Sequence, residues 1–191
     1  MFLQKEISFI DLFKLKHWSM NGDEFSYKYN YPFKIIFCDI TIEGREITNW
    51  TQPLFEAEGI AVFGLLTKVL NNKRLFLVRL CPECGCFDDI ELGPSIQKEA
   101  NDLKENNIVE KKFFENLHKG KNIIFDTLLS EEGGRFFHEQ NRNVIMEIDD
   151  GEIVDLPEEY IWVDLKTLNE LVQMNNVLNI QLRNLISILE A

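Results

Sequence analysis

The residues best suited to proton transfer are concentrated in one short stretch, residues 130–142. This stretch contains two adjacent glycines, two arginines, one histidine, one asparagine and three glutamates. Glutamate and histidine are the usual general acids and bases of enzymes, so we predict Glu131, Glu132 and His138 as the catalytic acid and base candidates. Paired glycines let the backbone form a bulge or approach a ligand closely. A polar surface loop leading into the next strand is the alternative, and the residues alone leave both interpretations open.

A second group of polar and aromatic residues could bind a ligand that carries phosphates and a flat ring. Arginine presents a planar fork that matches a diphosphate, and a Trp ring beside amide donors suits a base or a sugar. The predicted binding residues are Trp50, Gln52, Gln97, Arg135, Asn141, Arg142, Asn179 and Arg183. Plain turns around residues 49–53 and 93–97 are the alternative. The polar residues from Asn179 to Arg183 are spaced by two positions. On a helix this spacing spreads their side chains over a wide arc, so they cannot all face one point.

Three of the four cysteines are crowded at Cys81, Cys84 and Cys86, and Cys38 is remote from them. A structural zinc site needs four ligands, which usually come as two such pairs, and no second pair is present in the sequence. The spacing is also a poor disulfide framework. We therefore expect no metal, and reduced thiols in a cytoplasmic protein.

The hydrophobic pattern intersperses strands and helices, which favours an α+β fold with a mixed sheet flanked by helices in a single domain. Predicted strands cover residues 34–42, 60–70, 74–80, 90–92, 143–148 and 160–163, with residues 123–129 ambiguous. Predicted helices cover residues 8–18, 98–119, 164–173 and 177–189. We expect a hairpin turn at residues 71–73, because Asn tolerates positive φ, and a helix C-cap at Gly120.

Composition and charge exclude some partners. The formal net charge of −12 on 191 residues repels nucleic acid and anionic membranes, so we expect neither as a partner. No apolar run approaches the roughly 20 residues that span a bilayer. The first six residues do not have the pattern of a secretory signal.

Five stretches together resemble, in order, one unit of the NDP-hexose 2,3-dehydratases. They are residues 45–54, 91–97, 126–136, 140–142 and 179–185. The resemblance covers roughly residue 26 to the C-terminus. It predicts a dehydratase-like domain over residues 26–191, preceded by an N-terminal helical segment over residues 1–25.

The resemblance implies a Nudix-like scaffold that lacks the Nudix hydrolase box, and an enzyme of the hydro-lyase class that needs no cofactor. The implied substrate is a dTDP-linked 4-keto-6-deoxyhexose. Removal of the C3 proton and loss of the C2 hydroxyl would give a 3,4-diketo-2,6-dideoxy sugar nucleotide. The alternatives are a non-catalytic sugar-nucleotide-binding or partner subunit, and a plain protein-interaction domain.

Members of this family look like two tandem units in one chain, whereas this sequence has one. We therefore expect a homodimer that rebuilds the two-unit body. Two apolar groups could contribute to its interface or could simply pack on the sheet. They are Leu178, Leu182, Leu185 and Leu189 in one stripe, and the pair Phe113 and Phe114.

Overall fold

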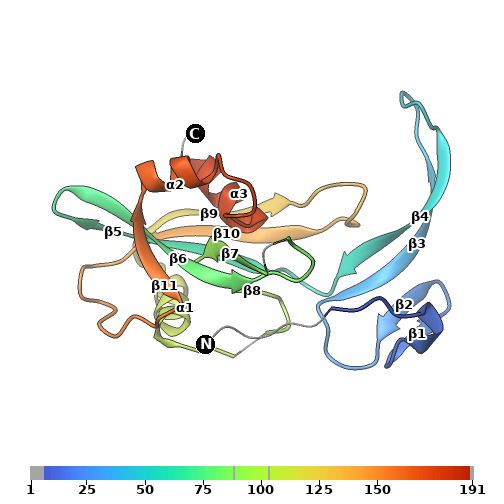
Figure 1. Cartoon of the computed structure of the whole chain (residues 1–191), viewed down its shortest axis with the longest axis horizontal. Helices are drawn as coiled ribbons and strands as arrows, with labels where there is room; N and C mark the ends of the chain where they lie inside the picture. Colours follow the sequence, from blue (N-terminus) through green and yellow to red (C-terminus); the bar gives the residue numbers. More distant parts are fainter. Residues whose placement is uncertain (1–6, 88, 103, 190–191) are drawn as a thin grey trace.

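The computed structural model describes residues 7–87, 89–102 and 104–189, which form two β-sheets and their flanking helices (Figure 1). The larger sheet has seven strands and forms the body of the molecule. The smaller sheet has four strands and projects from one end of the body as an arm. The strands are β1 (Trp18–Asn21), β2 (Glu24–Tyr27), β3 (Phe33–Thr41), β4 (Asn49–Ala57), β5 (Val62–Leu70), β6 (Lys73–Pro82), β7 (Ile90–Pro94), β8 (Ile96–Lys98), β9 (Ile123–Ser130), β10 (Gln140–Glu147) and β11 (Tyr160–Asp164).

The large sheet is mixed. Its strand order is β11-β6-β5-β10-β9, with β7 added to β6 and β8 added to β5. Strands β5 and β10 run parallel, and the other pairs are antiparallel. This arrangement confirms the predicted α+β class with a mixed sheet.

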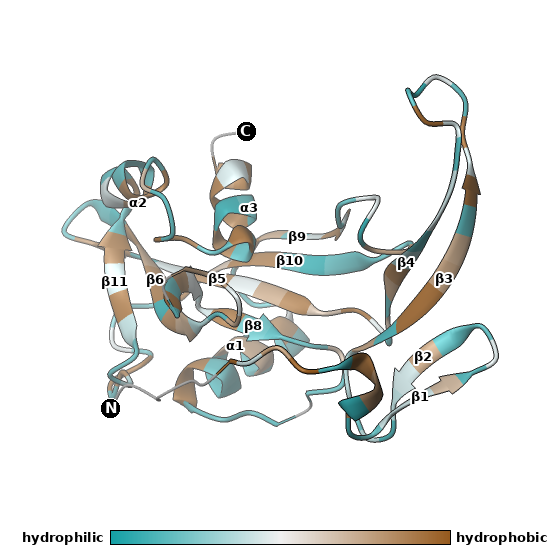
Figure 2. Cartoon of the chain, turned by 45° about the vertical axis from the view of Figure 1, so that its right-hand side comes forward, coloured by the Kyte–Doolittle hydropathy of each residue, from teal (hydrophilic) through white to brown (hydrophobic). Residues whose placement is uncertain are grey.

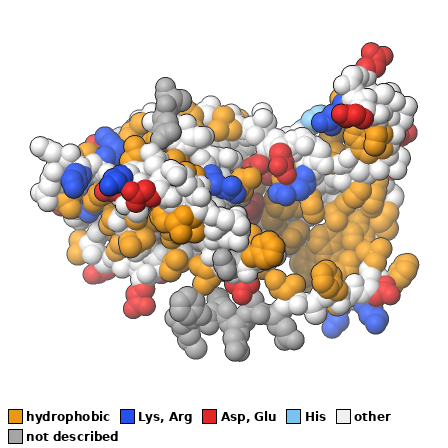
Figure 3. Space-filling model, turned by 45° about the horizontal axis from the view of Figure 1, so that its top comes forward, with side chains coloured by type: hydrophobic (Ala, Val, Ile, Leu, Met, Phe, Trp, Pro, Cys, Tyr) orange, Lys and Arg blue, Asp and Glu red, His pale blue; other side chains and the backbone are white. Residues whose placement is uncertain are grey.

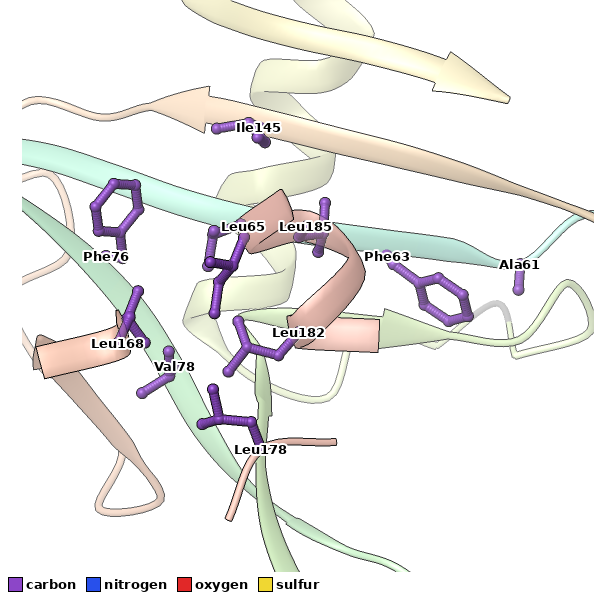
Figure 4. Close-up of a cluster of buried hydrophobic side chains, with 11 residues drawn as sticks. Ala61, Phe63, Leu65, Phe76, Val78, Ile145, Leu168, Leu178, Leu182 and Leu185 are labelled. Carbon is purple, nitrogen blue, oxygen red and sulfur yellow. The ribbon is translucent and has the colours of Figure 1, made fainter. Parts of the chain in front are cut away.

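Helices cover both faces of this sheet. Helix α1 (Ile108–Lys119) packs on one face, and α2 (Leu165–Leu171) and α3 (Ile180–Leu189) pack on the other. Successive side chains of a strand point to opposite faces, so Leu65 joins the core under α3 whereas Leu66 joins the core under α1. Figure 4 shows Leu182 and Leu185 of α3 directed at the sheet.

The two apolar groups considered for a dimer interface belong largely to these cores. Leu178, Leu182 and Leu185 are buried under α3, and Leu189 is partly buried beside them. Phe113 is fully buried in the opposite core, and Phe114 packs against it at its edge. Both groups therefore pack on the sheet.

Local signals read from the sequence account for several element ends. Asn71 and Asn72 have φ values of 51° and 60°, as the predicted hairpin turn between β5 and β6 requires. Gly120 ends α1 in the left-handed region with φ 63°. Asp164 caps α2 by accepting a hydrogen bond from the Thr167 N–H.

The arm contains strands β1 to β4 in that order, all antiparallel. Among the described residues of these strands, Leu54 alone is buried. Hydrophobic residues nevertheless run along β3 (Figure 2), and Phe37 is 50% exposed. The arm is thus a thin layer that owes little to a core of its own.

The structure corrects four predictions. Residues 8–18 do not form a helix: a short 3-10 helix, Leu12–Lys14, is followed by β1. Phe9 and Phe13 are almost fully exposed, so the apolar spacing meets no surface that could stabilise a helix. Helix α1 starts ten residues later than expected, because residues 96–98 pair with β5 as strand β8. Strand β7 includes Gly93 and ends at Pro94, two residues beyond the predicted end at residue 92.

The fourth correction concerns Trp50, which lies within the long strand β4 and not beside a turn. The two residue ranges proposed as domains, 1–25 and 26–191, stay a prediction, although the helical character of the first is not observed. Strand β2 pairs directly with β3, so residues on both sides of that boundary share one sheet.

Candidate functional site

The sheet face under α3 continues beyond the helix as a row of largely buried polar side chains. In adjacent strands, Gln97 of β8 lies opposite Phe63 of β5, and Phe63 lies opposite Asn143 of β10. Asn141 lies two residues before Asn143 and therefore points to the same face. Both asparagines are nearly inaccessible, at 3% and 2%. Strands β8 and β10 thus place the amide side chains of Gln97, Asn141 and Asn143 on one sheet face, next to the N-terminus of α3; we call this the amide-lined face.

A carboxyl cluster lies at the end of the amide-lined face. The Asn141 Nδ2 donates a hydrogen bond of 2.7 Å to Glu131 Oε1 and makes a longer contact of 3.5 Å with Glu139 Oε1. Glu139 is 8% exposed. Two buried polar atoms of the cluster, Glu139 Oε2 and Asn141 Oδ1, have no hydrogen-bond partner. Because buried polar atoms are normally paired, these two mark the cluster as unusual.

Burial and mutual repulsion raise the pKa values of two carboxyls in this cluster, Glu139 and Glu99. Burial raises the pKa of Glu139, the charge of Glu131 raises it further, and Glu99 adds to the effect. The pKa of Glu99, which follows β8, is raised by burial and by Glu131 as well. Carboxyls with raised pKa values in a partly enclosed site are candidates for acid–base catalysis.

The loop between β9 and β10 carries Glu131 and Glu139. Hydrogen bonds hold it at its base and along its length. Glu131 N–H donates to the Glu139 carbonyl at 3.0 Å, which closes the base of the loop. Phe55 of β4 exchanges backbone hydrogen bonds with the loop, receiving one from Phe137 and donating one to Arg135. The free edge of the arm therefore braces the loop that carries Glu131 and Glu139.

Trp50 and Gln52 contribute to the same brace. The Gln52 amide donates to the Gly134 carbonyl at 2.6 Å, and its oxygen accepts the Trp50 indole N–H at 2.7 Å. The Gln52 amide thus bonds within the protein, and both residues tie the glycine turn to β4. Figure 3 shows hydrophobic side chains gathered in the hollow between the arm and the body.

A second buried polar group lies at the start of α3. Asn179 is 2% exposed, and its Nδ2 donates to Gln97 Oε1 and to Glu83 Oε1, both at 2.9 Å. Its Oδ1 accepts the Leu182 N–H and so caps the helix. A Cβ at Gly93 would lie 2.9 Å from Asn179 Nδ2 and 2.4 Å from the Cys81 sulfur, so glycine permits this close approach.

The structure separates the predicted site residues into distinct places. Glu131, Asn141, Gln97 and Asn179 share the face under α3. Glu132 and Arg135 form an exposed ion pair of 3.3 Å on the loop. His138 is exposed, has φ 50° and stacks on Phe137 at 4.1 Å. Arg183 is exposed in the first turn of α3.

Arg142 lies apart from the other predicted ligands. It follows Asn141 directly in β10 and therefore points to the opposite face of the sheet. There it makes two hydrogen bonds to Asp126 of β9, at 2.8 and 2.7 Å. The guanidinium lowers the pKa of the Asp126 carboxyl through these bonds. Arg142 is thus engaged with a carboxylate on a different face from the cluster.

The sequence interpretation did not single out Glu139, Glu99 or Glu83. Glu139 had a signal, because it is two residues from Asn141 at the start of a strand and therefore shares its face. Glu99 and Glu83 had none, since they reach the site only through the pairing of distant strands. Two hollows of about 510 and 530 Å³ lie elsewhere, one beside Arg74 and Leu189 and one beside Arg142.

Cys81 is buried in β6, where burial raises the pKa of its thiol, whereas Cys84 and Cys86 are exposed. Within the described part of the chain, no group of three or more His, Cys, Asp or Glu side chains is arranged to bind a metal ion. Over the same residues, no helix has the length and apolar character needed to cross a membrane.

Comparison with known proteins identifies the family. The family model described as NDP-hexose 2,3-dehydratase matches residues 3–189. The chain belongs to the NDP-hexose 2,3-dehydratase family. It is 31% identical over 182 residues to a Streptomyces violaceoruber protein named dTDP-4-dehydro-6-deoxy-alpha-D-glucopyranose 2,3-dehydratase, covering 93% of this chain and 41% of that protein. Proteins of the same name from Saccharopolyspora spinosa and Amycolatopsis orientalis are 28% and 27% identical, with 38% and 37% of their lengths covered. The chain thus spans about two fifths of the length of these curated relatives.

Solved structures similar to this NDP-hexose 2,3-dehydratase family member include a C. elegans Ap4A hydrolase. The TM-score is 0.41 at 14% identity, covering 68% of this chain and 92% of the hydrolase. An ADP compounds hydrolase gives a TM-score of 0.46 at 10% identity, covering 85% and 86%. The similarity is one of overall fold, and nothing about the chemistry of this chain follows from it.

Proposed function

We propose that this chain is a nucleotide-sugar 2,3-dehydratase that acts on a dTDP-linked 4-keto-6-deoxyhexose. Family membership supports the class of reaction. The observation that carries the proposal is the placement of Glu131 beside Glu139 and Asn141, at the end of an amide-lined sheet face. A dehydration of this kind needs a base, an acid and hydrogen-bond donors. Glu131 is the proposed base, the amides of this face are donors, and the adjoining loop carries candidates for the acid.

The reaction begins at C3 of the sugar. The C3 proton lies alpha to the C4 ketone and is therefore the acidic one, and the Glu131 carboxylate removes it. The negative charge moves to the C4 oxygen, where amide N–H donors stabilise it. Gln97 is suited to this role, because its oxygen accepts from Asn179 and its N–H groups remain as donors.

The C2 hydroxyl then leaves as water after it receives a proton. The C2–C3 double bond formed is an enol, which tautomerises to the 3,4-diketo-2,6-dideoxy sugar. C3 is oxidised from an alcohol to a ketone while C2 is reduced to a methylene, so the reaction consumes no external oxidant or reductant. The exposed side chains of Glu132 and His138 on the same loop are further candidates for the protonation steps.

The nucleotide end of the substrate requires positive charge. Arg135 extends from the loop next to the cluster, and Arg183 extends from the first turn of α3, where the helix dipole also favours an anion. We propose that these two arginines hold the diphosphate. The Trp50 ring would then lie against the base or the sugar, in addition to bracing the loop.

The decisive test is turnover with dTDP-4-keto-6-deoxyglucose in the presence of a chelator. A ketoreductase added to the mixture traps the labile diketo product. We expect product formation by the wild-type chain, and loss of it in Glu131→Gln with nucleotide-sugar binding retained. Saturable binding without product would instead indicate a non-catalytic binding or partner subunit. Absence of binding would contradict the proposal in both forms.

We also propose that two copies of the chain form a homodimer. The support is the arm, whose strands bury a single residue and leave Phe37 half exposed, together with the exposed apolar side chains of Phe9 and Phe13. Apolar surface of this extent marks an interaction site, and a twofold pair covers it with one self-complementary patch. Light scattering at micromolar concentration should give twice the chain mass. A monomer mass that persists with substrate bound would contradict the proposal.

We propose that the protein is cytoplasmic, because the crowding of Cys81, Cys84 and Cys86 with Cys38 far away in the sequence is a poor disulfide framework.

A further inference from the structure

The two unpartnered atoms of the carboxyl cluster are chemically complementary. Asn141 Oδ1 can only accept a hydrogen bond, and Glu139 Oε2 can donate one only if the carboxyl carries a proton. The second polar atoms of the same amide and carboxyl groups already contact each other, since Asn141 Nδ2 lies 3.5 Å from Glu139 Oε1. A neutral carboxylic acid and a primary amide can satisfy each other on both sides at once. A proton on Glu139 would make Oε2 a donor for Asn141 Oδ1 and so give both orphaned atoms a partner.

We propose that Glu139 carries a proton, pairs as a neutral acid with the Asn141 amide, and thereby positions Glu131 as the base of the reaction. This inference rests on the proposed dehydratase function. Glu139 and Asn141 are accordingly positioning residues, and Glu131 is the catalytic one. The Asn141 nitrogen bonds to Glu131 and also contacts Glu139, so one amide group links the two carboxyls.

The two contacts of the Asn141 nitrogen support this assignment of charge. Hydrogen bonds to an ionised carboxylate are shorter than bonds to a neutral acceptor. The nitrogen lies 2.7 Å from Glu131 Oε1 and 3.5 Å from Glu139 Oε1. The shorter bond makes Glu131 the stronger acceptor of the two, and the longer contact fits a neutral Glu139.

The surroundings of Glu139 also favour the protonated form. Its own loop contributes the negative charge of Glu131, and the segment after β8 contributes Glu99. Burial is the largest cause of the raised pKa of Glu139, and these two negative charges raise it further. The hydrogen bond from Asn141 and the charge of Arg135 act in the opposite direction, but the pKa remains raised. A second buried negative charge at this point would also repel the Glu131 carboxylate.

Paired substitutions separate this role from direct proton transfer by Glu139. Glutamine at position 139 has the same shape, and its amide can accept from Asn141 Nδ2 and donate to Asn141 Oδ1. Alanine removes both bonds. We expect Glu139→Ala to lower kcat by about 100-fold, because the base is no longer held in place. Glu139→Gln should retain about tenfold more activity than Glu139→Ala.

The pH profile supplies a readout that a purely structural role would not change. In the wild-type chain, the pair exists only while Glu139 is protonated, so activity should fall as the pH rises through its raised pKa. Glu139→Gln cannot lose that proton and should lack this fall. Glu170→Gln, an exposed substitution on α2, serves as the matched control and should retain the wild-type profile. Equal inactivity of the Gln and Ala variants would overturn the proposal.

Carbon-13 NMR of the glutamate carboxyls tests the proton without any substrate. The resonance missing from Glu139→Gln identifies Glu139, and we expect it to titrate above the usual glutamate pKa of about 4.3. Glu99→Gln should lower its midpoint, because one repelling charge is removed. Titration of Glu139 in the usual range would overturn the pair even in an active enzyme. If the wild-type chain shows no turnover, the proposed function fails together with the role of base, and the titration still decides the pair.

Discussion

Replacing Asn179 with alanine should destabilise the protein and loosen the amide-lined face at the same time. Asn179 caps α3 through the Leu182 N–H and donates to both Gln97 and Glu83, which lie 82 and 96 residues away in the chain. Alanine removes all three bonds. The residue is 2% exposed, so water cannot fully replace them.

The size of the effect follows from these bonds. Loss of an N-cap costs about 1 kcal/mol. Leaving a buried acceptor without its donor costs about 1–3 kcal/mol. For Glu83 we expect a cost at the low end of this range, because its half-buried carboxylate can bind water instead. The sum is roughly 3–5 kcal/mol in the free energy of unfolding. For a chain of this length that corresponds to a fall in Tm of roughly 6–20 °C.

Thermal unfolding followed by circular dichroism measures this directly, with two companion variants. Asn184→Ala lies on the exposed side of the same helix and should change stability by less than about 0.5 kcal/mol. Asn179→Asp keeps the capping oxygen but places a second oxygen against those of Gln97 and Glu83. We therefore expect it to be destabilised almost as much as the alanine variant. A Tm for Asn179→Ala equal to that of the exposed control would refute the reasoning.

Two further predictions concern the faces of the sheet. Arg142→Ala should change the affinity for a dTDP-sugar by less than about twofold, because the Arg142 guanidinium is bound to a carboxylate away from the cluster. Arg135→Ala should instead weaken binding of the dTDP-sugar by about 1.5–3 kcal/mol, with little change in Tm. Calorimetry checks both, and a larger loss for Arg142 would show that it reaches the ligand. Gly64→Ala should cost about 1–3 kcal/mol in unfolding free energy, since a Cβ there would lie 2.5 Å from the fully buried Phe113 ring. An unchanged denaturation midpoint would contradict this packing.

Short-range features of the fold were accessible from the sequence. The strands on either side of the hairpin turn, the turn itself at Asn71 and Asn72, and the helix ends at Gly120 and Asp164 depend on residues within a few positions of one another. The conformational preferences of those residues act locally, so pattern and residue type suffice. The dense polar stretch that contains Glu131 was also visible, because its residues are adjacent in the chain.

Features without a local signal were predicted wrongly or missed. The spacing of Phe9 and Phe13 is typical of a helix, yet no surface is present to cover them, and residues 8–18 are largely extended. The arm strands were largely overlooked for a related reason. The side chains of β1 and β2 show no alternation between buried and exposed positions, which is the pattern that identifies a strand with one buried side.

The composition of the site was decided by the tertiary structure. Asn141 and Arg142 are neighbours in the sequence, but alternation along β10 sends them to opposite faces, so one joins the carboxyl cluster and the other pairs with Asp126. Glu99 reaches Glu139 only because β8 and β10 flank the same strand, β5. The sequence by itself determined which chemical groups are available and where short elements begin and end. Strand register and the faces of the large sheet determined which of those groups meet, because contacts between distant residues depend on how the strands pair and carry no signature in the sequence near either residue.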